Sequence, residues 1–268
     1  MSAEQRAYWN GPAGERWATG QARMDESLEP ATRELIPFAA PRPGERALDV
    51  GCGCGTTTLR LRDLGCAVTG IDVSGPMLEV ARARAPELSF VLADAATHAF
   101  RAEHDLVFSR FGVMFFEDPV AAFANLRTSL APGGRLAFAC WRALADNPWA
   151  AAPLAATRDL LPPPEPVEPH APGPFAFADR DRLIGILERA RFTDITVTPR
   201  DTAMFMGATI EQAADEGLSI GPLARLASGL DPDARAAIRD RLVAEYARHV
   251  TPAGIALGAA IWLVAARR

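Results

Sequence analysis

The sequence predicts an α/β fold built on a doubly wound, mostly parallel sheet of seven strands, in which the last strand is antiparallel. Two observations support this prediction. Short apolar runs alternate with helical patterns from Arg46 to Trp141, as expected for strands that are buried on both faces and joined by crossover helices. After residue 191 the pattern becomes strand, helices and strand, so the last two strands would form a hairpin that a helical insertion interrupts.

The boundaries of the elements follow from apolar runs and from Pro and Gly. Asp118-Pro119 suits a helix start, and Pro132-Gly133-Gly134 is a sharp stop. The predicted strands are 46–50, 67–72, 88–92, 105–109, 135–141, 195–199 or slightly longer, and 256–266. The predicted helices around them are 56–64, 76–85, 120–130 and 180–191.

The chain divides into two parts by composition. Residues 1–44 read as one or two helices that end at Pro41-Arg42-Pro43-Gly44, and residues 45–268 form the main domain. Residues 45–141 are the ligand-binding core of that domain, and about 208–250 are the helical insertion. Seven Pro between 162 and 174 predict a stiff, extended crossing that cannot join a sheet.

Charge and composition exclude several functions. The net charge is −5, which argues against nucleic acid as a partner, because proteins that bind phosphate backbones present basic surfaces. All 28 basic residues are Arg, so lysine Schiff-base chemistry is absent. The four Cys lack the spacing of a zinc site, and we expect no metal. Sparse thiols, no apolar signal core and no membrane-spanning run favour a cytoplasmic protein.

A glycine-rich turn follows the first predicted strand, in the run Asp49-Val50-Gly51-Cys52-Gly53-Cys54-Gly55. Gly lets the backbone turn tightly and approach a ligand without a clash at Cβ. Asp49 at the strand end can accept a hydrogen bond from an ammonium group. Dinucleotide-binding proteins use a related turn, but their glycines are spaced G-x-G-x-x-G, whereas here they fall as G-x-G-x-G.

Acids also stand at the ends of the second and third strands. Asp72, followed by Val73, can accept both hydroxyls of a ribose, which fits a nucleoside site without choosing the cofactor. Asp94, followed by Ala95, can accept an N–H group, and the apolar neighbours would flank a planar ring. A fourth segment runs from Asp105 through Ser109 to Pro119 and continues into the Pro-Gly-Gly turn.

These four segments, in this order and spacing, resemble the class I S-adenosylmethionine (SAM)-dependent methyltransferases. The resemblance covers about residues 45–141 and implies a Rossmann-like fold with SAM as cofactor. It assigns the adenine amine to Asp94 and extends the cofactor site to Ser109. Cys54 departs from the commonest pattern, in which Thr, Ser or Ala stands at this position; Cys is small, so we expect no loss of function.

The N-terminal segment adds a weaker resemblance. Tyr8-Trp9-Asn10-Gly11-Pro12 with Trp17, and Asn147-Pro148-Trp149, look like a small-molecule group related to the methyltransferases of ubiquinone and menaquinone synthesis. In that group N-terminal helices cover the cofactor, so Trp9 and Trp17 join the expected cofactor site. The inserted helices would either roof the acceptor site or form a dimer face.

Transfer from a sulfonium needs positioning more than a nucleophilic side chain. A base is required only if the acceptor must lose a proton. The weak candidates for catalysis are His98, Arg110 and Tyr8. Two other functions stay open: a SAM-binding regulatory protein without catalysis, and, less favoured, a dinucleotide-dependent oxidoreductase. The identity of the small-molecule acceptor and the C, N or O atom that is methylated stay open.

Overall fold

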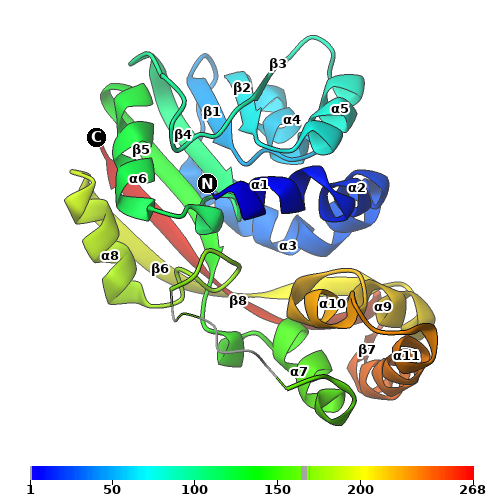
Figure 1. The fold of residues 1–268 in the computed structure, drawn as a ribbon. Helices are drawn as coiled ribbons and strands as arrows, with labels where there is room; N and C mark the ends of the chain where they lie inside the picture. The colour runs from blue at the N-terminus through cyan, green and yellow to red at the C-terminus, as the bar shows by residue number, and fades with distance from the viewer. Residues whose placement is uncertain (1, 164–167, 169) are drawn as a thin grey trace.

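A computed structural model describes residues 2–163, 168 and 170–268 of the chain. It contains a mixed α/β fold in which helices surround one sheet (Figure 1). Residues 164–167 and 169, which belong to the predicted proline-rich crossing, lie outside the described residues.

The central sheet follows the predicted plan, with one addition. Its strand order is β3-β2-β1-β4-β5-β8-β6, and the two-residue strand β7 pairs with β8 as an eighth strand that the sequence did not predict. The first five strands of this order are parallel, and β8 is antiparallel to both of its main neighbours. The bounds are β1 (Arg46–Val50), β2 (Ala67–Asp72), β3 (Ser89–Leu92), β4 (His104–Arg110), β5 (Leu130–Trp141), β6 (Thr193–Gly207), β7 (Val250–Thr251) and β8 (Gly254–Arg267).

Helices cover both faces of the sheet. From β1 the chain moves outward to β2 and β3, and from β4 it moves the opposite way to β5, so right-handed crossovers place α4 and α5 on one face and α6 on the other (Figure 1). The α-helices are α1 (Ala3–Asn10), α2 (Pro12–Thr19), α3 (Gln21–Ala39), α4 (Thr56–Asp63), α5 (Gly75–Arg84), α6 (Pro119–Ser129), α7 (Pro148–Ala156), α8 (Arg180–Arg189), α9 (Ile210–Gly217), α10 (Gly221–Ala227) and α11 (Pro232–Tyr246).

The reversal of strand order between β1 and β4 determines where a ligand can bind. The loops after these two strands diverge to opposite faces and leave a crevice at the carboxyl edge of the sheet. The glycine turn follows β1 at this edge, and Ser109 and Arg110 stand at the end of β4. The topology therefore brings the segments singled out in the sequence to one place.

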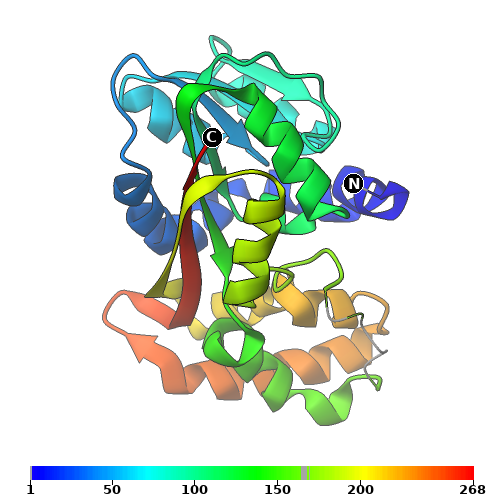
Figure 2. The ribbon, with the colours of Figure 1, turned by 90° about the vertical axis from the view of Figure 1, so that its left-hand side faces the viewer.

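The N-terminal segment contains three helices, where the sequence predicted one or two. Gly11 and Gly20 lie between them. The longest, α3, packs against β5 and β6, and it continues through Pro30 and Pro37. Between the strands of the sheet and the inserted helices, α1–α3 occupy the middle of the molecule in both views (Figures 1 and 2).

The strand β6 is much longer than the predicted 195–199. Its pairing with β8 continues from Arg200↔Ile261 to Gly207↔Ile255, past the point where Trp141 ends the pairing of β5 with β8. The helices α9, α10 and α11 follow β6 and precede β7. They are therefore grouped beyond the carboxyl edge of the parallel strands, at the end of the molecule away from β1–β3 (Figure 2).

Candidate functional site

The glycine turn has a backbone that only Gly adopts readily. Gly51, Gly53 and Gly55 have φ values of +68°, +53° and +82°. A Cβ on Gly51 would lie 2.7 Å from the Cα of Gly112, so the loops after β1 and β4 touch through two glycines. The turn ends where α4 begins at Thr56, which leaves free N–H groups at the helix start.

Asp49 is a fully buried carboxylate with one unused oxygen. Its Oδ2 accepts hydrogen bonds of 2.7 Å from the hydroxyls of Thr57 and Thr58. Its Oδ1 has no hydrogen-bond partner among the described residues. Burial raises the pKa of Asp49 to about 6, against the opposing effect of the two Thr hydroxyls. The site therefore contains an oxygen that a ligand's hydrogen-bond donor can satisfy.

Asp72 connects the second strand to the glycine turn. Its Oδ2 accepts the N–H of Gly53 at 2.8 Å, and its Oδ1 accepts the N–H of Ser74 at 2.9 Å. Burial raises the pKa of this carboxyl, and the backbone N–H donors lower it. Each carboxylate oxygen has two lone pairs, so both can accept a further hydrogen bond from a ligand.

Asp94 lies at the same edge, after β3. Its Oδ1 accepts the N–H of Ala96 at 2.9 Å, and Arg6 of α1 lies 3.8 Å from its Oδ2. Asn125 of α6 donates to the backbone carbonyls of Ala95 and His98, which fixes the turn. The three acids thus lie at or just after the carboxyl ends of three adjacent parallel strands, as the sequence predicts.

The first two helices are bound to the turn after Asp72. Ser74 Oγ donates to the carbonyl of Trp9 at 2.7 Å, and the side chain of Asn10 bonds to Val73 and Gly75. The ring of Trp9 makes edge contacts with Tyr8, Trp17 and Phe115. The carbonyl of Trp17 contacts the thiol of Cys54 at 3.9 Å. These helices therefore cover the turns that follow β1 and β2.

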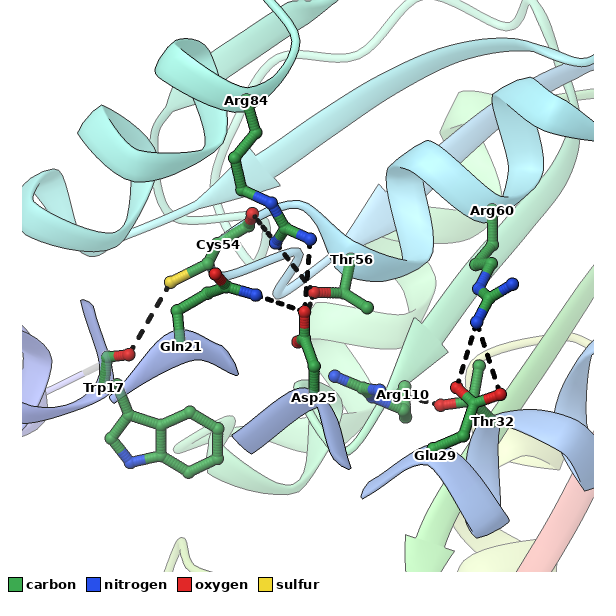
Figure 3. Close-up of polar contacts among 10 residues, drawn as sticks. All are labelled: Trp17, Gln21, Asp25, Glu29, Thr32, Cys54, Thr56, Arg60, Arg84 and Arg110. Carbon is green, nitrogen blue, oxygen red and sulfur yellow. Dashed lines mark hydrogen bonds and ion pairs between the residues drawn. The ribbon is translucent and has the colours of Figure 1, made fainter. Parts of the chain in front are cut away.

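A polar cluster at the start of α3 was not predicted from the sequence (Figure 3). Asp25 accepts hydrogen bonds from Gln21 and from Thr56, the first residue of α4, and it forms a 3.1 Å ion pair with Arg84 of α5. Arg84 also donates to the carbonyl of Cys54 at 2.8 Å. The cluster joins α3, α4 and α5 around the glycine turn. No motif signals it, because its members are far apart in sequence.

Two residues at the end of β4 have different surroundings. Ser109 is buried and donates to the carbonyl of Val50 at 2.7 Å, so its hydroxyl connects β4 with β1. Arg110 donates to Thr32 of α3 at 2.7 Å (Figure 3). Burial lowers the pKa of Arg110, while Asp25 and Asp49 raise it. A guanidinium has five N–H donors, so Arg110 can bind an anion as well as Thr32.

The other catalytic candidates are more peripheral. Tyr8 is an exposed side chain on α1. The ring of His98 packs edge-on against Phe100 after β3. In contrast, aromatic rings fill the space beyond β4 and β5: Phe111 stacks on Trp141 with centroids 4.0 Å apart, and Trp141 contacts the buried Trp149. Cys52 is buried, and burial raises the pKa of its thiol.

Neither a cluster of metal-binding side chains nor a membrane-spanning helix occurs in the described part of the chain. No group of three or more His, Cys, Asp or Glu side chains there could hold a metal ion. No helix in these ranges has the length and apolar character needed to cross a membrane.

Comparison with known proteins identifies the central region. Residues 48–138 match a family described as a methyltransferase domain. The chain is 38% identical to trans-aconitate 2-methyltransferase of Methylobacterium radiotolerans, over 48% of this chain and 54% of that protein. It is 36% identical to demethylmenaquinone methyltransferase of Beutenbergia cavernae, over 47% and 51%. The match thus spans about half the length of these curated relatives.

The fold also matches a solved structure along almost the whole chain. Phosphoethanolamine N-methyltransferase 2 of Haemonchus contortus, solved in complex with SAM, aligns with a TM-score of 0.60 at 16% identity. The alignment covers 98% of this chain and 59% of that one. At this identity the comparison establishes the Rossmann-like fold that the sequence predicted.

Proposed function

We propose that this chain transfers a methyl group from SAM to a small-molecule acceptor, because residues 48–138 match a family described as a methyltransferase domain and resemble the class I, SAM-dependent type. The observation that carries the proposal is the unused Oδ1 of Asp49, beside a glycine turn and in line with two further strand-end acids. A buried carboxylate oxygen without a donor is costly, and the ammonium group of SAM would satisfy it.

The strand-end acids and the glycine turn would each take one part of an adenosyl sulfonium. Asp49 would hold the ammonium, and the backbone of Gly51, Cys52 and Gly53 would border the methionine chain. Asp72 would accept the ribose hydroxyls while it keeps its bond to Gly53. Asp94 would accept the adenine amine, with the ring between Val73 and Ala95.

The remaining predicted residues would act around this core. Trp9 and Trp17 belong to helices that cover the site and would exclude water from it. Ser109 is proposed to hold the crevice together through Val50 rather than to donate to the cofactor, because its hydroxyl already donates there. Arg110 is the candidate residue for binding a carboxylate group, whether that of SAM or one on the acceptor.

Catalysis would then rest on position. Bound SAM supplies an activated methyl group, so the chain needs no nucleophilic side chain. Holding two reactants in line can lower a barrier by roughly 7–11 kcal/mol. The helices α1–α3 and α9–α11 would bring the acceptor to the crevice, which makes a roof our preferred role for the insertion over a dimer face. We do not assign His98 as a base, since its ring packs on Phe100.

The acceptor class follows from charge and from the relatives. A chain with a net charge of −5 suits a small molecule better than nucleic acid. The relatives named for trans-aconitate and demethylmenaquinone also act on small molecules. All four thiols are free and buried, which supports our assignment to the reducing cytoplasm.

Turnover distinguishes this function from SAM binding without catalysis. We would incubate the full chain with methyl-labelled SAM and a panel of carboxylic acids, phenols, amines and quinols. The proposal predicts label transfer to at least one class and formation of S-adenosylhomocysteine. Tight SAM binding with no transfer to any class would instead favour the regulatory role.

A further inference from the structure

A cavity of about 310 Å³ lies beyond the carboxyl edge of the sheet, between the start of α3, the end of β6 and α9. Its walls include Arg23, Ser27, Phe205, Met206, Gln212 and Glu216. This volume is at the lower end of the range for small-molecule sites.

Glu216 is the unusual residue of this wall. It is 1% exposed, and neither of its carboxylate oxygens has a hydrogen-bond partner among the described residues. Its one ion pair there is loose, because Arg23 Nη1 lies 3.6 Å from Oε2 and the Arg23 side chain is 58% exposed. Burial raises the pKa of Glu216, and Arg23 lowers it in part. A buried carboxylate without hydrogen-bond donors is destabilising unless a partner supplies them.

Helix α11, which packs against α9, donates no hydrogen bond to Glu216. The hydroxyl of Tyr246, on α11, is buried beside Gly217 and has no hydrogen-bond partner among the described residues. Gln212, one turn earlier on α9, uses its Oε1 to accept the N–H of Ala208. The insertion therefore leaves Glu216 in the cavity wall, and Tyr246 on a neighbouring helix, without hydrogen-bond partners among the described residues.

Another part of the cavity wall is apolar. Phe205 and the buried Met206 are apolar, so they suit a ring or an alkyl chain. A matching ligand has an apolar body and a hydrogen-bond donor that faces Glu216. It would displace the exposed side chain of Arg23 from its loose contact.

The cavity and the proposed cofactor site both contact helix α3. Asp25 on this helix bonds to Thr56 beside the glycine turn, while Arg23 and Ser27 from the same turn of the helix line the cavity. One helix, about 10 Å across, therefore lies between the two, so an acceptor held in the cavity would have to extend around α3 to bring its nucleophilic atom to the crevice.

We propose that this cavity binds the donor-bearing end of the methyl acceptor, a small molecule with a hydroxyl or amine group, and that Glu216 accepts its hydrogen bond. The inference rests on the proposed methyl transfer, because it assigns the cavity to the acceptor of that reaction. It makes Glu216 a specificity-determining residue.

The test uses small probes and the full chain saturated with S-adenosylhomocysteine. Phenol and benzylamine would be compared with their capped or donor-free analogues, anisole and toluene, by saturation-transfer NMR. The variants are Glu216→Leu, which removes the acceptor oxygens, and Glu216→Gln, which keeps one oxygen but loses the charge. The control is Glu211→Gln, an exposed change in the first turn of the same helix.

The inference predicts that the wild type binds phenol or benzylamine about tenfold more tightly than its analogue. Glu216→Leu should abolish this preference for both donor probes. Glu216→Gln should weaken the binding of benzylamine more than that of phenol. The control variant Glu211→Gln should keep the preference for both probes. Affinity for S-adenosylhomocysteine should stay unchanged throughout.

Equal binding to the wild type and to both Glu216 variants would overturn the inference, and so would a wild type that binds neither donor probe. A wild type that fails to bind S-adenosylhomocysteine would refute the proposed function instead. Should Glu216→Leu fail to fold, the charge-loss variant alone still decides the benzylamine comparison.

Discussion

The N–H of Gly53 donates a 2.8 Å hydrogen bond to Oδ2 of Asp72, so the glycine turn after β1 and the acid at the end of β2 form one unit. Replacement of Asp72 would therefore disturb two parts of the proposed cofactor site. We predict that Asp72→Ala lowers SAM affinity by more than about tenfold, since it removes the ribose acceptors and releases the turn. Titration calorimetry measures this, with the exposed Asp63→Ala as control. Unchanged affinity in Asp72→Ala would show the ribose assignment to be wrong.

The raised pKa of Asp49 makes stability depend on pH. The native state binds this proton more tightly than the unfolded state, so the contribution favours folding below about pH 4 and is lost as pH rises to about 6. The rise from 3.8 to about 6 corresponds to about 3 kcal/mol. We predict that Asp49→Asn is more stable than the wild type at pH 7.5 without ligand, as denaturant titration would reveal. Equal stability of the two at pH 4 and at pH 7.5 would contradict the burial argument.

The same group should control binding in the opposite direction. Only the ionised carboxylate pairs with an ammonium group, and Arg110 and Asp72 are the charged neighbours that influence its titration. SAM affinity should fall by up to about tenfold per pH unit below pH 6 in the wild type. Asp49→Asn should bind weakly at every pH. A wild-type affinity that is constant from pH 5 to pH 8 would argue against Asp49 as the ammonium partner.

Gly14 allows α1 and α2 to pack against the turn after β2. A Cβ at this position would lie 2.0 Å from the carbonyl oxygen of Trp9 and 2.9 Å from Ser74 Oγ. We predict that Gly14→Ala displaces these helices and speeds SAM dissociation, as stopped-flow measurements would detect. Gly185→Ala on α8 is the matched control, because its Cβ would meet nothing within 4 Å. Identical dissociation rates in the two variants would refute the covering role.

Asn147 connects the insertion side of the molecule to the sheet. Its Oδ1 accepts N–H groups of Trp149 and Ala260, and its Nδ2 donates to the carbonyls of Arg142 and Ala143. The residue is fully buried, so Asn147→Ala should lower the free energy of unfolding by about 2–4 kcal/mol. Denaturant titration measures the loss. A change below about 0.5 kcal/mol would mean that the network carries little of the stability.

The sequence predicts the short strands β1 and β2 better than it predicts the long strands β5 and β6. The predicted sharp stop at Pro132-Gly133-Gly134 is wrong as the break before the fifth strand, because β5 begins at Leu130 and includes these residues. The bounds of β1 and β2 agree residue for residue with the prediction, because apolar runs there end at Gly or Asp. In β6, Arg200 and Asp201, which follow Pro199, resemble a loop. They lie in a strand because β6 is an edge strand, where outward-facing charges and Pro are tolerated.

The sequence also predicts some residues of the candidate site and misses others. Asp49, Asp72 and Asp94 can be found from the sequence, because each lies at or just after the end of a recognisable strand and parallel strands end at one edge. The contacts of Asp25 with Thr56 and of Arg23 with Glu216 cannot, because they join segments that only the tertiary fold brings together. The unbroken α3 was also hidden, since Pro30 and Pro37 suggest helix breaks.

Binding of SAM to the purified chain is the most direct test of the central claim. Calorimetry at pH 7.5 should give saturable, one-to-one binding of SAM and of S-adenosylhomocysteine, and no binding of NAD or FAD. Heat from NAD or FAD, together with none from either adenosyl sulfur compound, would contradict the account.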